Sequence, residues 1–170
     1  MSSVKIVHVN SKRELQSFID FPHELFKADK NYVPELFVAQ RDLLTPGKHP
    51  FHEHSQVQAF LAYRNEKIVG RIAAISNSNH NIFNKANDGF FGFFDCENNK
   101  DVAAHLFSEA SEWLKNKGAN TLIGPTNFST NETCGLLVDG YDSPPTIMMT
   151  YNPSYYRDLV EGFGFRKKAD

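Results

Sequence analysis

The sequence predicts an α/β fold, in which a mixed, mainly antiparallel sheet is flanked by helices. Three observations lead to this prediction. Residues 57–64 and 67–76 are two strand-like runs separated by the polar turn Asn65-Glu66, which is typical of an antiparallel hairpin. Residues 89–95 (GFFGFFD) are apolar on both faces, as expected for a central strand that is covered on both sides. Residues 101–117 carry apolar side chains at helical spacing.

The first elements of the chain follow from local signals. Residues 4–9 are a β-branched run that predicts a strand. Residues 11–14 (SKRE) form the capping box of a helix, which Pro22 is expected to interrupt. A second helix is expected to begin at Pro34 and to end at the Thr45-Pro46-Gly47 turn.

The last third of the chain is expected to contain short strands and one helix. The strands are expected at residues 121–123, 135–139 and 146–150, with the polar loop 124–134 between the first two. Asn152-Pro153 supplies a cap and a first-turn proline for the helix, which should end around Gly162 and Gly164. No further strand follows it, so the strands that would close the sheet are expected to be absent.

Strict alternation along residues 89–95 assigns the side chains of this strand to faces. Phe90 and Phe94 are expected to share one face. The opposite face is expected to carry Phe91, Phe93, Asp95 and Glu97. Gly92 leaves a notch, which a packed core would fill or which the chain of a ligand could occupy.

Composition excludes several classes of protein. A length of 170 residues with 41% apolar residues predicts a single domain, residues 1–170. The 18 basic and 20 acidic residues give a net charge of −2, which argues against a nucleic-acid binder with a basic surface. No apolar run approaches the roughly 20 residues that span a bilayer, and residues 1–5 lack a signal peptide's apolar stretch. The two cysteines, Cys96 and Cys134, match no disulfide framework, which suits a cytoplasmic protein.

Long segments of the chain resemble one family of proteins. They are residues 33–54, 69–81, 89–97, 124–140 and 151–165. These segments and the order of elements resemble the GNAT acyltransferase superfamily, and within it the bacterial ceramide-synthase-like proteins. Members of that group have a second GNAT-like half, so the chain resembles the first half of a longer two-domain protein.

The resemblance implies an acyl-CoA-dependent N-acyltransferase that acts on a long-chain amine or lipid substrate. Acyl-CoA would be a co-substrate, and no tightly bound cofactor is implied. The family places a glycine-containing turn before its long helix, where backbone N–H groups hold the CoA pyrophosphate. Here residues 96–101 (CENNKD) contain no glycine, and Glu97 and Asp101 would repel the phosphates. Many members also use a tyrosine four residues before the glycine of a Gly-Phe pair, and counting back from Gly164 gives Val160.

These departures imply that the isolated chain binds CoA thioesters weakly and is inactive by itself. Its function is therefore either the N-terminal half of an N-acyltransferase or, as the alternative, a non-catalytic module that binds substrate or partner.

Carboxylates near the end of the central strand are candidate catalytic residues. Asp95 and Glu97 could act as general base on an amine, or could form a solvated strand end and helix cap. Glu132 is a third candidate, because long polar loops such as 124–134 often bind ligands. The alternative for this loop is a turn that satisfies its own backbone. The candidate substrate-binding residues are Asn127, Ser129, Asn131, Tyr151 and Asn152.

Three histidines, His49, His52 and His54, form a compact group that could hold a metal in a hydrolase. Their spacing places no two imidazoles on one helix face, and Pro50 indicates a loop. No metal site is therefore predicted.

The open sheet is expected to leave an edge strand unpaired, at residues 146–150 or 119–123. Unpaired N–H and C=O groups on an apolar strand favour pairing with another chain. The sequence therefore predicts a possible homodimer.

Overall fold

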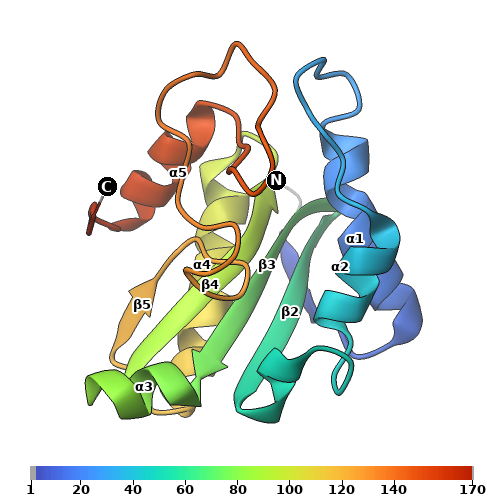
Figure 1. The fold of residues 1–170 in the computed structure, drawn as a ribbon. Helices are drawn as coiled ribbons and strands as arrows, with labels where there is room; N and C mark the ends of the chain where they lie inside the picture. Colours follow the sequence, from blue (N-terminus) through green and yellow to red (C-terminus); the bar gives the residue numbers. More distant parts are fainter. Residues whose placement is uncertain (1–2, 170) are drawn as a thin grey trace.

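The computed structural model describes residues 3–169 and shows a five-stranded sheet with helices on both faces (Figure 1). The strands lie in chain order and are β1 (Lys5–His8), β2 (Ser55–Arg64), β3 (Lys67–Asn77), β4 (Asp88–Cys96) and β5 (Thr121–Ile123). Each of the strands β1 to β4 is antiparallel to its neighbours in this set, and β5 runs parallel to β4. The predicted mixed, mainly antiparallel sheet is confirmed.

The helices divide between the two faces of this sheet. They are α1 (Lys12–Leu25), α2 (Phe37–Leu44), the 3-10 helix η1 (Pro50–Glu53), α3 (Ser78–Asn84), α4 (Lys100–Asn116) and α5 (Tyr155–Phe163). Helices α4 and α5 pack together on one face, and α1 with α2 covers the other (Figure 1). None of the helices within residues 3–169 has the length and apolar character needed to cross a membrane.

Phenylalanines build an apolar core on each face of the sheet. On the α4 face, Phe94 of β4 stacks on Phe107 with ring centroids 4.5 Å apart. On the α1 face, Phe51 stacks on Phe128 with centroids 4.7 Å apart. The phenylalanines of β4 are therefore core residues on both faces.

The prediction of strands at residues 135–139 and 146–150 is wrong, because the chain between β5 and α5 is an irregular loop. Asn152 supplies part of the reason. Its Oδ1 accepts a hydrogen bond from the Leu137 N–H at 2.8 Å, and its Nδ2 donates to the Leu137 carbonyl at 3.2 Å. A side chain thus satisfies backbone groups that a neighbouring strand would have used. Pro144-Pro145 also removes two backbone donors.

The predicted start of α2 is also wrong, since the helix begins at Phe37 and not at Pro34. The residue before Pro34 is Val33, whose side chain cannot cap a helix, and Leu36 is still extended. Helix α3 and η1 were not predicted.

Helix α1 starts with the predicted capping box but continues through Pro22 to Leu25, so the predicted interruption is wrong. Proline has no N–H, and the carbonyl of Phe18 therefore loses its helical partner. The Nη1 of Arg71 donates a hydrogen bond of 2.8 Å to this carbonyl. The strand side chain thus replaces the helical bond that Pro22 removes.

Strand β4 contains a bulge that changes which side chains face α1. Arg71 pairs with Asp95 and Ala73 with Gly92, so two residues of β4, Phe93 and Phe94, lie opposite one residue of β3. Phe93 has a φ of 50°, in the left-handed region.

The predicted assignment of faces is therefore wrong beyond Gly92. Phe91 and Phe94 lie in the core under α4, while Phe90 and Phe93 lie in the core under α1. Asp95 pairs across the strands with Arg71 on the α1 face, and so lies opposite to Phe91.

The notch at Gly92 is filled by the protein's own backbone. A Cβ built on Gly92 would lie 1.7 Å from the carbonyl oxygen of Thr126. Thr126 also donates its N–H to the Phe91 carbonyl at 2.8 Å, which ties the loop after β5 to β4. The notch is therefore a packing contact and leaves no room for a ligand.

We expect Gly92→Ala to lower the free energy of unfolding by about 3 kcal/mol, since its Cβ would displace the backbone at Thr126. Gly162→Ala is the matched control, because a Cβ there has no atom within 4 Å and the residue lies in α5. This second change should be neutral or stabilise by up to about 1 kcal/mol. Urea unfolding of both variants is the measurement, and equal stability of the two would contradict the packing argument.

Candidate functional site

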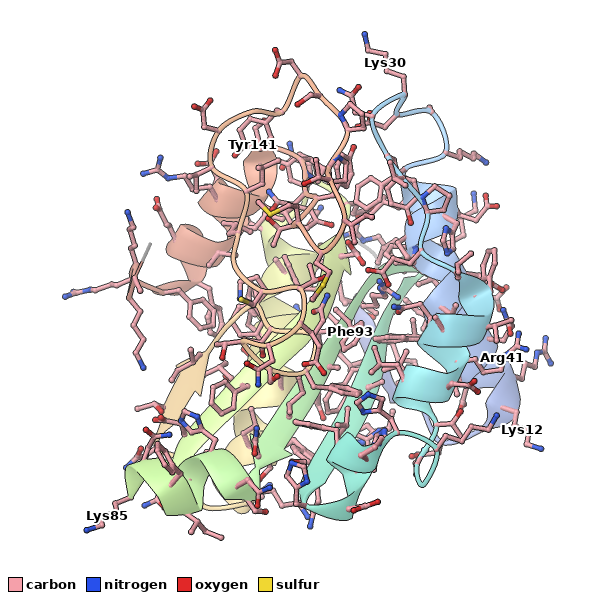
Figure 2. The ribbon with its side chains drawn as sticks, in the orientation of Figure 1. Lys12, Lys30, Arg41, Lys85, Phe93 and Tyr141 are labelled. Carbon is pink, nitrogen blue, oxygen red and sulfur yellow. The ribbon has the colours of Figure 1, made fainter. Side chains whose placement is uncertain are left out.

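A cavity of about 300 Å³ lies beside the second half of β4, between the α1 side of the molecule and the loop that precedes α5. Phe93, labelled in Figure 2, contributes to its wall near the middle of the molecule. The polar side chains that line the cavity are His23, Tyr32, Glu35, Gln40, Arg71, Asp95, Asn127, Thr133, Thr146, Thr150, Tyr151, Asn152 and Tyr156. These residues are spread along the chain from His23 to Tyr156, and only the fold brings them together.

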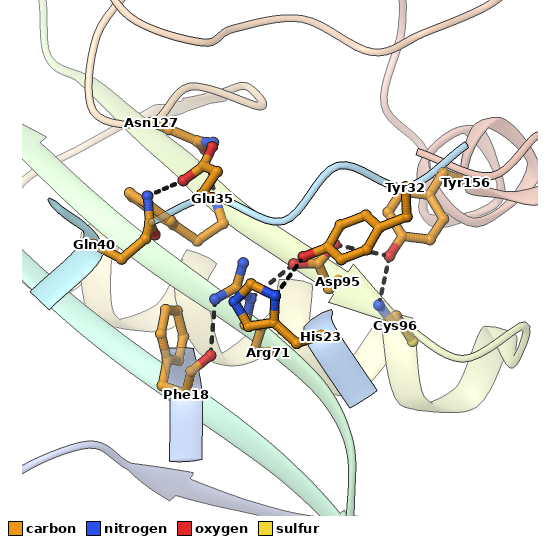
Figure 3. Close-up of polar contacts among 11 residues, drawn as sticks. Phe18, His23, Tyr32, Glu35, Gln40, Arg71, Asp95, Cys96, Asn127 and Tyr156 are labelled. Carbon is orange, nitrogen blue, oxygen red and sulfur yellow. Dashed lines mark hydrogen bonds and ion pairs between the residues drawn. The ribbon is translucent and has the colours of Figure 1, made fainter. Parts of the chain in front are cut away.

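A buried ion pair lies beside this cavity (Figure 3). The Nε of Arg71 donates to Asp95 Oδ2 at 2.7 Å, and the guanidinium lies over the Phe18 ring, 4.8 Å from its centroid. The hydroxyl of Tyr156 donates to Asp95 Oδ1 at 3.1 Å and accepts from the Cys96 N–H at 2.9 Å. Both carboxylate oxygens of Asp95 are therefore engaged, which holds the carboxylate in a fixed orientation.

Two neutral groups lie next to the ion pair. The Tyr32 hydroxyl and His23 Nδ1 are 3.1 Å apart. Burial, followed by the charge of Arg71, lowers the pKa of His23. Burial raises the pKa of Tyr32 to about 12. At neutral pH the imidazole is therefore uncharged and the phenol protonated, so the phenol can donate to Nδ1.

Glu35 adds a second carboxylate to the cavity wall. It precedes α2 in the extended segment, and its Oε2 accepts a hydrogen bond from Gln40 Nε2. Although part of the residue is exposed, the groups around its carboxylate desolvate it and raise its pKa. The nearby charge of Arg71 acts in the opposite direction.

Four of the predicted site residues line this cavity: Asp95, Asn127, Tyr151 and Asn152. Asn127 Oδ1 accepts from the Phe93 N–H at 2.8 Å, so it caps the bulge of β4. The Tyr151 hydroxyl bonds to the carboxylate of Asp29, which ties the loop before α5 to the segment after α1.

The other predicted residues lie outside the cavity. Glu97 pairs with Arg64 at 2.6 Å on the partly exposed side of the strand end. Glu132 Oε2 accepts from the Ser129 N–H at 2.8 Å and from its Oγ at 2.7 Å, so this part of the loop is a turn that satisfies its own backbone. Ser129, Asn131 and Glu132 line a separate hollow near α3.

Sequence reasoning missed several residues of the cavity. Arg71 carried a usable signal, because a single cation within the apolar run of β3 needs a buried partner. His23, Tyr32 and Glu35 follow no spacing that distinguishes them from surface residues, so no sequence pattern pointed to them.

The three histidines near η1 have structural contacts. His49 Nδ1 accepts from the Phe51 N–H at 3.3 Å, and His52 Nε2 lies 2.9 Å from the Leu43 carbonyl. The ring of His54 packs edge-on against Phe51. Within residues 3–169, no group of three or more His, Cys, Asp or Glu side chains is arranged to hold a metal ion.

The first turn of α4, where the GNAT pattern places the CoA pyrophosphate, does not fit that group. Asn99 Oδ1 accepts from the N–H groups of Asp101 at 3.0 Å and Val102 at 3.1 Å, so two donors of this turn are already used. Asp101 adds an acidic side chain to this turn, whereas Glu97 is paired with Arg64. An anion would have to displace the cap and approach the carboxylate of Asp101.

Comparison with known proteins relates the chain to two bacterial proteins. It is 38% identical over 170 residues to the bacterial ceramide synthase of Caulobacter vibrioides, a match that covers 99% of this chain and 44% of that protein. It is 36% identical over 160 residues to protein YghO of Escherichia coli, covering 94% of this chain and 41% of that protein. The chain thus spans less than half the length of either relative. No protein-family model matches it.

Solved structures share the fold of this chain. The aminoglycoside acetyltransferase meta-AAC0020 from an uncultured soil metagenomic sample, in complex with sisomicin, gives a TM-score of 0.55 at 12% identity, over 98% of this chain and 91% of that chain. The aminoglycoside N-acetyltransferase AAC(6')-Iy in complex with CoA gives 0.56 at 13% identity, over 100% and 92%. The predicted GNAT-like fold is confirmed, as is the resemblance to ceramide-synthase-like proteins.

Replacing Asp95 with asparagine should lower the free energy of unfolding by about 3 kcal/mol or more, because the buried guanidinium of Arg71 would lose its counter-charge. Glu97→Gln is the control. It breaks the more exposed pair with Arg64 and should cost about 1 kcal/mol or less. Denaturant unfolding followed by circular dichroism measures both, and similar losses for the two variants would show that the buried pair has no special role.

Proposed function

Since this chain has the GNAT fold and is similar to part of the protein named bacterial ceramide synthase, we propose that it belongs to an acyl-CoA-dependent N-acyltransferase. We propose further that the acceptor is a long-chain amine, held in the cavity beside β4. In this reaction the amine nitrogen attacks the thioester carbonyl carbon, a C–N bond forms and the C–S bond breaks. The sulfur leaves as a thiol with a proton from the nitrogen.

The observation that carries this proposal is the amphipathic character of the cavity. Charged groups lie on its wall, whereas its rim is apolar and exposed. We name this rim the apolar collar, formed by Val33, Ile147, Met148 and Met149, with Leu36, Phe37 and Val38 next to Val33 along the chain. Ile147 is 94% exposed and Leu36 77%. A group of large apolar side chains that is left exposed in this way is typical of a binding surface. A polar head in the cavity with an alkyl chain on the collar fits this arrangement.

Among the three candidate acids, Asp95 is the one that lines the cavity, so we propose roles for it and not for Glu97 or Glu132. Its oxygens already bind Arg71 and Tyr156, which suits a group that shapes and polarises the site. Asn127, Tyr151 and Asn152 are proposed to define the wall that the substrate contacts. Residues 146–150 form no strand, so they offer no sheet edge. A homodimer through the edge at residues 119–123 stays a prediction, and so does the cytoplasmic location.

The test is acyl transfer by the full-length gene product, with palmitoyl-CoA as donor and thiol release as readout. Sphinganine should be a far better acceptor than ethanolamine, because the collar would bind its alkyl chain. The 170-residue chain assayed beside it should release no thiol. Ile147→Ser should raise the KM for sphinganine about fivefold, because it removes roughly 1 kcal/mol of binding free energy from apolar contact. The KM for ethanolamine should not change. No transfer to any primary amine would refute the proposal.

The alternative function, a non-catalytic substrate- or partner-binding module, is favoured for the isolated chain by the first turn of α4. Because the Asn99 cap and the acidic Asp101 occupy the place of a phosphate cradle, we expect the chain to bind CoA with a dissociation constant above about 1 μM. Calorimetric titration with CoA measures it, and AAC(6')-Iy serves as the positive control. Submicromolar binding would show that the chain holds CoA by another route.

A further inference from the structure

Glu35 places a carboxylate on the wall of the cavity. Within residues 3–169 its side chain takes part in no ion pair, and Gln40 is its hydrogen-bonding partner (Figure 3). That bond uses Oε2 and leaves Oε1 without a partner among the described residues. A carboxylate can accept several hydrogen bonds, so Oε1 remains available to a ligand in the cavity.

Gln40 holds this carboxylate in place. Its side chain is buried, with 8% of the residue exposed, on the inner face of α2. A buried amide must find hydrogen-bonding partners, and Glu35 accepts from its Nε2. The bond therefore fixes the carboxylate against the cavity wall, where an unsupported side chain on an extended segment would turn into solvent.

The other charged groups of the cavity cancel one another. Arg71 and Asp95 form an ion pair, and the imidazole of His23 and the phenol of Tyr32 are uncharged at neutral pH. Glu35 alone therefore gives the cavity its net negative charge when it is ionised. Burial raises its pKa, and the nearby charge of Arg71 and the Gln40 hydrogen bond offset only part of that rise, so a bound cation would lower the pKa further.

We propose that Glu35, positioned by Gln40, binds the ammonium group of an alkyl monoamine whose chain lies on the apolar collar. This inference deepens the proposed function and rests on it, since it names the residue that recognises the acceptor. A ligand with one cationic end matches the single uncompensated carboxylate. A second charge farther along the ligand would lie against the apolar collar, at a cost in desolvation.

The test compares two probes of equal chain length, hexylamine and hexan-1-ol, which differ in the cationic group. Binding to the 170-residue chain is followed by NMR titration at neutral pH. We expect hexylamine to bind about tenfold or more tightly than hexan-1-ol, as for a charge-assisted hydrogen bond. In Glu35→Gln this preference should be lost, while the affinity for hexan-1-ol stays within about twofold. Hexylamine binding to Glu35→Gln with wild-type affinity would overturn the proposal.

Three further variants separate recognition from folding. Glu112→Gln removes an exposed carboxylate on α4, outside the cavity, and should leave both affinities unchanged. Gln40→Leu keeps the buried volume but removes the hydrogen bond to Glu35. It should reduce the ratio of amine affinity to alcohol affinity, whereas a loss of stability alone would weaken both affinities equally. Glu35→Asp retains the charge and should keep part of the preference, so the proposal can be tested even if Glu35→Gln folds poorly.

The binding titration and the acyl-transfer assay together distinguish a failure of this inference from a failure of the proposed function. If hexylamine binds through Glu35 but the full-length product transfers no acyl group, the proposed function fails and the amine site stands. If acyl transfer occurs and Glu35→Gln leaves the KM for sphinganine unchanged, the function stands and the assignment of Glu35 is wrong.

Discussion

The buried ion pair between Arg71 and Asp95 is the interaction on which the rest of the structure depends. Removing two charges from water costs about several kcal/mol of folding free energy. A buried pair is therefore tolerated only when its remaining hydrogen-bond donors and acceptors are satisfied. The Phe18 carbonyl on α1 and the Tyr156 hydroxyl on α5 meet that need. Because these partners come from opposite layers, satisfying the charges also fixes both layers against β3 and β4. The cavity lies where the layers meet.

The bulge at Phe93 makes this arrangement possible. With strict alternation from Phe91, Asp95 would lie on the α4 face, away from Arg71 and among apolar side chains. The extra residue moves it to the α1 face. It also turns the N–H of Phe93 away from β3, and Asn127 accepts that N–H from the loop after β5. One irregularity in a strand therefore sets both the polar wall of the cavity and the path of the loop that covers Gly92.

The sequence predicted those parts of the fold whose signals are local. The capping box, the turn between β2 and β3 and the apolar stripe of α4 each depend on residues a few positions apart, and all three are confirmed. The errors come from contacts distant in the sequence. Pro22 is accommodated because Arg71 of another element binds the free carbonyl, and the bulge depends on pairing with β3. In the candidate site, Asp95 and Asn127 could be predicted because they are polar residues at a strand end and in a long loop. Glu35 could not be predicted, because its place on the cavity wall depends on its hydrogen bond with Gln40 in the folded chain.

The loop before α5 is held by side chains instead of a strand ladder. Asn152 binds the backbone at Leu137, the Tyr141 hydroxyl donates to the Leu137 carbonyl, and Asn31 donates to the Tyr141 carbonyl. Such a segment has no register, so an insertion or deletion within it shifts no hydrogen bond of the sheet. The collar residues Ile147, Met148 and Met149 belong to this loop. Natural selection can therefore remodel the outer wall of the cavity while the folded scaffold beneath stays the same.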